Sequence, residues 1–516
     1  MATRFAGPPC LQALLGDMCA GMGGPPGPVG QGQRQAALLA AARQAAEARP
    51  VGPQDLGQPG SWRFLGNGVY GVVVALRSHW PPPPGLAPTV VLKLGVSVDF
   101  DKCLPALDLV CGRKASVPLT DWAWAGAFRA SREHAAHGIL LKCLQRATCG
   151  GGSGACGSPH VVQGVAWGTW TLPGPPQSIV DLLKGLGVQG LPEALDAHKI
   201  LSRPTARVQW CLQEFAGVGL APMLKTRLVP ACGAAPLDVL RVYQSAALQA
   251  LVGVLHLHRA GLHHNDLHAS NVLGVPVTTR YLYYVVGARG PASPGSSCPT
   301  VATPGQLLDL LQPYALRRRS HSLRVLLRVP TWGALWRVGD LGGATSHALH
   351  PLDHGMMARV WFGGPRFAAR VMAGVAPRAP LHAFDAARLL CALHRNASSA
   401  LAAPEQAPTR RLVQQWLQRV LDGAQDRAKA LARAARKPLV LVSEAGTPPV
   451  PVSAQAADEA RLLQAVTRTD AACKDVGATR AVLLHAAELA GCVLKAKDVP
   501  AALGRDPHWR DNLFFV

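Results

Sequence analysis

The stretch GLHHNDLHASNVLG, residues 261–274, carries the most specific pattern in the chain. His264, Asp266 and Asn271 give it the spacing H-x-D-x-x-x-x-N. The carboxylate of Asp266 can accept or orient the proton of an attacking hydroxyl group. The amide oxygen of Asn271 can turn back, five residues later, to hold a metal ion. Either side chain alone would be an ordinary surface or capping group, so the interpretation depends on the neighbouring segments.

Two flanking segments support a site at this stretch. The run LDVLRVYQSAALQALVGVLHLHRAG, residues 237–261, has a broad apolar side at helical spacing, which predicts a long helix that ends at Gly261. Downstream, WRVGDLGGAT, residues 336–345, delivers Asp340 from strand-like residues to a glycine-containing turn. A carboxylate at such a turn suits Mg²⁺, which prefers hard oxygen ligands.

Upstream, GNGVYG has the pattern G-x-G-x-x-G, formed by Gly66, Gly68 and Gly71. Two different phosphate-binding designs share this pattern. In a dinucleotide fold the third glycine opens a helix, whereas the valines that follow here are poor helix starters and suit a second strand. The motif therefore indicates the tip of a hairpin that can lay backbone N–H groups over phosphates. A purely structural hairpin is the alternative.

Lys93, in VVLKLG, is the first lysine in a chain whose basic residues are mostly arginine. A compact ammonium on a flexible stem can reach phosphates and a carboxylate from inside a sheet, where a wide guanidinium would not fit. A surface lysine on an edge strand is the alternative. Glu133, on the helical run that follows, is the expected carboxylate partner, and Asp121 and Asp101 compete with it.

These segments together resemble the protein kinase superfamily over roughly residues 61–420. The matching segments are GNGVYGVV, VVLK, REHAAHGILLKCL, SPHVV, LQEFAGVGLAPML, LHLHRAGLHHNDLHASNVL, VGDLG and AFDAARLLCAL. The resemblance implies an α+β, two-lobed fold: a small antiparallel β-sheet lobe with one main helix, and a larger, mostly helical lobe. It also implies an ATP-dependent enzyme that transfers the γ-phosphate of MgATP to serine or threonine hydroxyls of proteins, with ATP and Mg²⁺ as cofactors.

The resemblance assigns roles to individual residues. It implies catalytic roles for Asp266, Lys93, Asn271 and Asp340, of which Asn271 and Asp340 would hold the metal. It implies cofactor contacts for Gly66, Asn67, Gly68, Gly71, Val73, Lys93, Glu133, Glu214 and Phe215. Gln213–Phe215 resembles a hinge that binds adenine through backbone groups, and Asp385 resembles a buried aspartate that braces the catalytic loop. An ordinary aspartate near a helix N-terminus is the alternative for Asp385.

A long insertion narrows the resemblance. The segment between Asn271 and Asp340 contains RYLYYVVG and RVPTWGALWRVGD. It resembles the extended segment, ending in a P-T-x-G strand pair, of divergent kinases encoded by large DNA viruses. Together with a composition that suggests GC-rich coding, this indicates a viral serine/threonine-type kinase.

Three departures from the family pattern keep other functions open. Asn265 stands where the family usually has an arginine, His268 where it usually has a lysine, and Leu341 where it usually has a phenylalanine. Asn265 removes the cation that would receive an activation-loop phosphate, so no such switch is expected. His268 also brings the motif closer to choline and aminoglycoside kinases, which makes a small-molecule phosphotransferase one alternative. A pseudokinase scaffold, in which the pocket only binds, is another.

The composition indicates a folded protein, and the sequence pattern suggests how the chain divides into domains. The 516 residues are 49 % hydrophobic and 16 % charged, which excludes a wholly disordered protein. Residues 1–60 are expected to form a disordered Gly/Pro/Ala-rich arm, 61–216 the smaller lobe and 217–516 the larger one. The larger lobe would contain the insertion at 275–336 and a basic helical extension from about residue 420.

The net charge and the cysteine pattern limit which partners and which cellular compartment are expected. A net charge of +22 suits anionic partners, but the arginines are spread along the chain, so a nucleic-acid partner is only weakly supported. No uncharged apolar stretch is long enough to predict a membrane span, and residues 1–34 lack signal-peptide features. None of the 13 cysteines forms C-x-x-C, which indicates free thiols in a reducing, intracellular compartment. That would be the host cytoplasm or nucleus, or the virion, if the protein is viral.

Overall fold

The computed structural model describes residues 62–67, 71–77, 89–96, 159–172, 174–198, 201–223, 235–259, 262–264, 266–286, 301, 303–311, 324–346, 382–434 and 477–516. The expected N-terminal arm, the helical run with Glu133, Asp121 and Asp101, and Gly68 and Asn265 lie outside these residues. Within them, no helix is long and apolar enough to cross a membrane.

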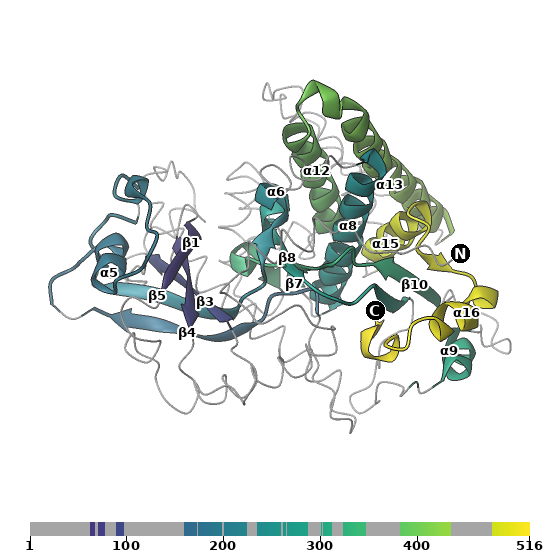
Figure 1. Ribbon diagram of the computed structural model, residues 1–516, viewed down its shortest axis with the longest axis horizontal. Coiled ribbons are helices and arrows are strands. Elements are labelled where there is room, and N and C mark those ends of the chain that lie inside the picture. Colours follow the sequence, from purple (N-terminus) through teal and green to yellow (C-terminus); the bar gives the residue numbers. More distant parts are fainter. Residues whose placement is uncertain are drawn as a thin grey trace.

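The first part of the described chain is a five-stranded antiparallel sheet with the order β1-β2-β3-β5-β4 (Figure 1). Its strands are β1 Arg63–Asn67, β2 Gly71–Arg77, β3 Thr89–Val96, β4 Gly164–Thr171 and β5 Arg207–Glu214. The strand pair expected at GNGVYG and the sheet position expected for Lys93 are confirmed by β1, β2 and β3. One face packs on α5 (Ile179–Gly185), which the sequence did not predict, and Trp170 stacks on Trp210 with ring centroids 5.5 Å apart.

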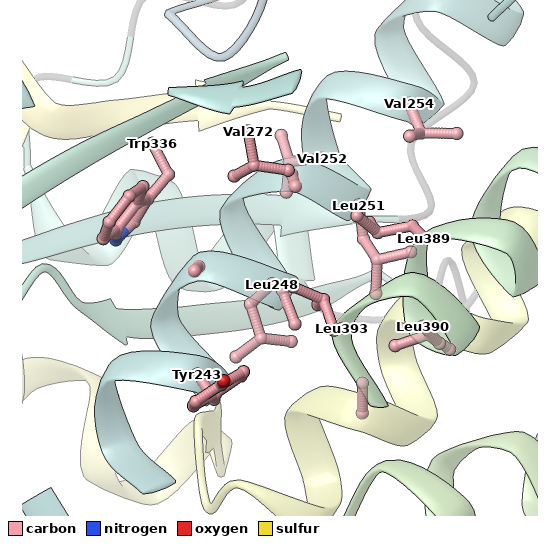
Figure 2. Close-up of a cluster of buried hydrophobic side chains, with 14 of the residues drawn as sticks. Tyr243, Leu248, Leu251, Val252, Val254, Val272, Trp336, Leu389, Leu390 and Leu393 are labelled. Carbon is pink, nitrogen blue, oxygen red and sulfur yellow. The ribbon is translucent and has the colours of Figure 1, made fainter. Parts of the chain in front are cut away.

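The rest of the described chain is built around helix α8, Pro236–Arg259, as the apolar pattern predicted. Helices α12 (His382–Ala400), α13 (Ala407–Ala434) and α15 (Gly477–Leu489) pack with it (Figure 1). Figure 2 shows Leu248 and Leu251 of α8 beside Leu389 and Leu393 of α12 in this core. The core is separate from the hydrophobic core of the five-stranded sheet.

A small sheet, with the order β11-β8-β6, borders two of the expected site residues, because Asn271 directly precedes β8 and Asp340 follows β11 by two residues. Its strands are β6 Val218–Gly219, β8 Val272–Pro276 and β11 Ala334–Val338; β7 Leu262–His263 pairs separately with β12 Thr345–Ser346. Buried Gln249 of α8 fastens the helix to β11, because its Oε1 accepts from the Trp336 N–H at 2.8 Å and its Nε2 donates to the Ala334 carbonyl at 3.2 Å. Short helix α6, Leu220–Met223, follows β6.

The expected insertion and the C-terminal residues form one further unit. Its strands are β9 Tyr281–Val286, β10 Val325–Pro330, β13 Val493–Leu494 and β14 Leu513–Phe515, in the order β13-β10-β9-β14, and β14 runs parallel to β9. Helices α9 (Pro304–Leu311) and α16 (Val499–Gly504) contribute to its core. The sequence indicated mostly helix after the insertion, so β13 and β14 are a correction. Helix α13 also crosses residue 420, where an extension was expected to begin.

Candidate functional site

Asp385 of α12 contacts His264, which begins the loop that continues with the described stretch 266–271. The Asp385 carboxylate, 1 % exposed, accepts a hydrogen bond from the backbone N–H of His264 at 2.7 Å. Its Oδ2 also lies 3.0 Å from His258 Nε2 at the end of α8. The other ring nitrogen of His258 lies 3.1 Å from the Thr479 hydroxyl of α15. The bracing role expected for Asp385 is confirmed, whereas the roles of His258 and Thr479 were not predicted.

The Asn271 side chain turns back to Asp266 within the expected H-x-D-x-x-x-x-N motif. Its Nδ2 donates to the Asp266 carbonyl at 2.8 Å, and its own carbonyl accepts from the Gly339 N–H at 2.9 Å. Donation through Nδ2 makes Oδ1 the end of the amide that can bind a metal ion. The Gly339 carbonyl lies 2.8 Å from His264 Nε2, so the residue before Asp340 is attached to both ends of the loop.

Asp340 and Lys93 meet although they are far apart in the chain. Lys93 Nζ of β3 lies 2.7 Å from Asp340 Oδ1, and the two side chains are 29 % and 32 % exposed. Asp340 has φ 60° and ψ 69°, a left-handed conformation that is uncommon for residues other than glycine and is enriched at functional sites. The structure therefore brings the expected lysine to the expected metal-binding carboxylate.

Asp266 has a cation beside it that the sequence did not point to. Arg388 Nη2, from α12, lies 3.5 Å from Asp266 Oδ1. The helix places Arg388 one turn after Asp385, so both side chains project from the same face toward the loop. Nearby, burial lowers the pKa of the His268 imidazole, and the negative charges of Asp266 and Asp340 oppose that shift.

A small apolar cluster lies between the first strands and the residues after β5. Ala75, Val91 and Phe215 are its buried members, and Leu65, Val73 and Val218 pack against them. Val73 is the register partner of Lys93 in the neighbouring strand. Val73 and Phe215, two of the expected cofactor-contacting residues, therefore belong to one apolar cluster, and Val73 of β2 lies opposite Lys93 of β3.

The side chain of Glu214 has a structural role that the sequence did not predict. Its Oε2 lies 2.7 Å from Arg337 Nη1 of β11, and its Oε1 accepts from the Gln163 N–H at 2.9 Å. Both charged side chains are under 10 % exposed. Both carboxylate oxygens of Glu214 are therefore engaged by Arg337 and Gln163. Only the backbone groups of Glu214 remain for the nucleotide contact that the sequence led us to expect.

Two glycines of the expected phosphate loop, Gly66 and Gly71, differ in how much space surrounds them. Gly66 and Asn67 lie at the end of β1, and Gly71 begins β2, so the predicted antiparallel hairpin is confirmed. A Cβ at Gly71 would lie 2.5 Å from the Leu94 carbonyl oxygen, whereas one at Gly66 would meet nothing within 4 Å. Gly71 is therefore required by strand packing, and Gly66 is not.

The described residues fit a magnesium ion held jointly with phosphates. Among them, no group of three or more His, Cys, Asp and Glu side chains could hold a metal by itself. Mg²⁺ in phosphate-transfer sites commonly uses one or two carboxylates plus substrate oxygens and water. The Asp340 carboxylate and Asn271 Oδ1 supply hard oxygens of this kind.

Comparison with known proteins gives distant structural likenesses. No family model matches the chain, and no curated protein matches it. Matching solved structures include a MAP kinase from Leishmania major, at 15 % identity and TM-score 0.19 over 46 % of this chain and 47 % of that one. They also include the pseudokinase PEAK1, at 11 % identity and TM-score 0.23 over 87 % of this chain and 98 % of that one.

The chain thus spans about half the length of that MAP kinase. The mixed helix and sheet content is that of the expected α+β fold. TM-scores this low place no residue of the site, which rests on the contacts described above.

Proposed function

We propose that the chain is an ATP-dependent protein kinase with a two-lobed fold, which transfers the γ-phosphate of MgATP to serine or threonine hydroxyls of proteins. The observation that carries the proposal is the 2.7 Å contact of Lys93 with Asp340 beside a loop that holds Asp266 and Asn271. The contacts link three separate parts of the sequence that carry four expected site residues, which supports a site for phosphoryl transfer.

Each residue has a chemical task in this proposal. Asp340 and Asn271 would hold Mg²⁺, which neutralises phosphate charge when bound, and Lys93 would orient the phosphates. Asp266 would align the acceptor hydroxyl and take up its proton. The apolar cluster with Val73 and Phe215 would cover the adenine, and backbone groups of Gln213–Phe215 would hydrogen-bond it. Gly66, Asn67, Gly68 and Gly71 would cover the phosphates, and Glu133 would pair with Lys93.

The viral origin and the intracellular compartment belong to the same proposal. The P-T-x-G segment supports the viral type: it forms a tight turn between β10 and β11, in which Trp332 and Gly333 have φ of 52° and 81°. Thr331 holds that turn by accepting from the Gly333 N–H at 3.2 Å.

The proposal is tested by a radiolabel assay with [γ-³²P]ATP and Mg²⁺. Casein and histone would be offered beside choline and an aminoglycoside. We expect transfer to protein at about 1–100 s⁻¹, the family scale. Asp340→Ala and Lys93→Met should lower the rate at least about 100-fold, the scale for losing one electrostatic contact to a transition state. Asp422→Asn, an exposed acid on α13, is the matched control.

Two results would contradict the proposal. Equal labelling by wild type and both site variants would mean that a contaminating kinase is responsible. Labelling of choline or the aminoglycoside alone would show the small-molecule enzyme instead.

A pseudokinase scaffold is the second candidate, and the environment of His268 favours it. Burial lowers the pKa of this imidazole, so it is a poor replacement for the family's lysine. Nucleotide at about 100 times its Kd should stabilise a one-site protein by ~2.7 kcal/mol. Such stabilisation without any phosphate transfer would establish the scaffold and exclude the enzyme.

A further inference from the structure

A buried chain of polar side chains runs from α15 to the loop that carries Asp266. The hydroxyl of Thr479, the third residue of α15, lies 3.1 Å from His258 Nδ1. His258 Nε2 lies 3.0 Å from Asp385 Oδ2, and the same oxygen accepts from the His264 N–H at 2.7 Å. These four linked residues are each 2 % exposed or less. The C-terminal helix thus reaches the loop through side chains that water does not touch.

The direction of each hydrogen bond follows from the donors that the groups possess. An ionised carboxylate only accepts, so the Nε2–H of a neutral His258 donates to Asp385. The other ring nitrogen, Nδ1, then accepts from the Thr479 hydroxyl. Thr479 therefore favours the tautomer of His258 that can hold Asp385. Because a buried polar group is costly to leave unpaired, each link restrains the position of the next.

The last link passes from His264 to Asp266. The Asp266 N–H donates to His264 Nδ1 at 3.3 Å, and His264 Nε2 lies 2.8 Å from the Gly339 carbonyl. A shift of His264 would therefore move both the carboxylate that aligns the acceptor and the residue before Asp340.

We propose that Thr479 is a positioning residue, which fixes the backbone at His264 through His258 and Asp385 and thereby holds Asp266 in place for the acceptor hydroxyl. This rests on the proposed function. It gives α15, which lies outside the kinase-like segment 61–420, a part in that function. Thr479 would touch neither the nucleotide nor the acceptor, so its effect would fall on the alignment of Asp266.

Helix α15 is also anchored by contacts that do not involve Thr479. The Cys492 carbonyl, just after the helix, accepts from the Arg328 N–H of β10 at 2.8 Å. Loss of the Thr479 hydroxyl should therefore leave the helix in place and weaken only the polar chain. Four apolar side chains of α15 are buried in the core around α8: Val482, Leu483, Ala486 and Ala487.

The first test measures kcat and KM in Thr479→Val, which keeps the side-chain volume but loses the hydroxyl. We expect kcat to fall about 10- to 100-fold with KM for ATP changed less than about threefold, because misplacing a reacting group by about 1 Å can cost 10² in rate. Thr479→Ser keeps the hydroxyl and should retain most of the wild-type kcat. Thr409→Val is the matched control and should equal wild type, because Thr409 is the buried third residue of α13.

The second test is residue-resolved hydrogen–deuterium exchange, which does not depend on turnover. The His264 amide donates to Asp385 and should exchange slowly in wild type. Thr479→Val should speed its exchange at least about fivefold, the factor for losing one net hydrogen bond, whereas Thr409→Val should not. Exchange in strand β9 should be the same in all these proteins, which would show that the fold is unchanged.

Each outcome decides the matter. Wild-type kcat in folded Thr479→Val, or unchanged exchange at His264, overturns the positioning role, while inactive Asp340→Ala would still support the kinase function. Equal losses in Thr479→Val and Thr479→Ser also overturn it, because the hydroxyl would then not be the cause. If Thr479→Val does not fold, Thr479→Ala decides by the same measurements. A wild-type protein that transfers no phosphate removes the proposed function, and exchange at His264 then decides alone whether Thr479 holds the loop.

Discussion

His160 shows how one buried side chain can make stability depend on pH. The imidazole is fully buried: its Nδ1 lies 2.8 Å from the Trp336 carbonyl, and its Nε2 lies 2.7 Å from the Tyr284 hydroxyl. A neutral ring meets both partners, since Nδ1–H donates to the carbonyl and Nε2 accepts from the phenol. Burial lowers the pKa of His160 to about 3.

We predict that acid destabilises the protein through this residue. The unfolded chain binds a proton at His160 below about pH 6.5, whereas the folded chain binds it only near pH 3. The free energy of unfolding therefore falls as pH drops through this window, by up to about 1.4 kcal/mol per pH unit. Urea titrations between pH 6.5 and 5 should show a shallower fall in His160→Gln than in wild type. Identical slopes would show that His160 is not the group responsible.

The residues of the candidate site differ in how visible they were in the sequence. Asp266 and Asn271 could be found because their spacing is specific and implies a chemistry, and Lys93 because it is the first lysine in a chain that mostly uses arginine. Arg388 and His258 could not, because their contacts reach across 122 and 127 residues and no local pattern records them. The one available signal for Arg388 was its position three residues after Asp385, which places both on one helix face.

At the scale of elements, the long helix α8 was predicted from the sequence, whereas the very short strands β13 and β14 were not. Helix α8 has 24 residues, enough for its apolar period to be unmistakable. Strands β13 and β14 have two and three residues, too few to show a period of two. They become strands only because the edges of β10 and β9 offer backbone partners, which is information from the tertiary structure.

Strand β14 is predicted to be required for stability despite its shortness. Val516 is fully buried and donates its N–H to the Val285 carbonyl at 2.9 Å, and Phe514 stacks on Tyr284 with ring centroids 5.8 Å apart. Deleting residues 513–516 exposes this surface of β9, and each buried apolar side chain contributes about 1.5–3 kcal/mol. We expect the thermal midpoint to fall by several degrees.

The deletion is measured by calorimetry beside two point variants. Phe514→Ala should give part of the loss, and Arg505→Gln, an exposed residue after α16, should give none. A deletion protein as stable as wild type would show that β14 adds nothing to the fold.

At the scale of the whole molecule, the described residues form two large hydrophobic cores that polar contacts connect. The core of the five-stranded sheet and the core around α8 share no buried residue. The polar links between the two regions include the Lys93–Asp340 pair, the Glu214–Arg337 pair and the backbone bond from the Val162 N–H to the Val338 carbonyl. Two of these links end on β11 and the third ends on Asp340, two residues after it, so the position of the sheet and the geometry of the site are connected.

The Glu214–Arg337 pair is therefore predicted to matter more than an ordinary ion pair. Removing one partner of a buried pair leaves the other charge uncompensated and costs about 3–5 kcal/mol, whereas replacing both by neutral groups of similar volume is often tolerated. We expect Glu214→Gln and Arg337→Met each to lower the free energy of unfolding by that amount. The double variant should lose less than the sum, a coupling measurable by denaturant unfolding of all four proteins. Additive losses would show that the two charges do not support each other, and that the sheet is held to β11 by backbone and apolar contacts instead.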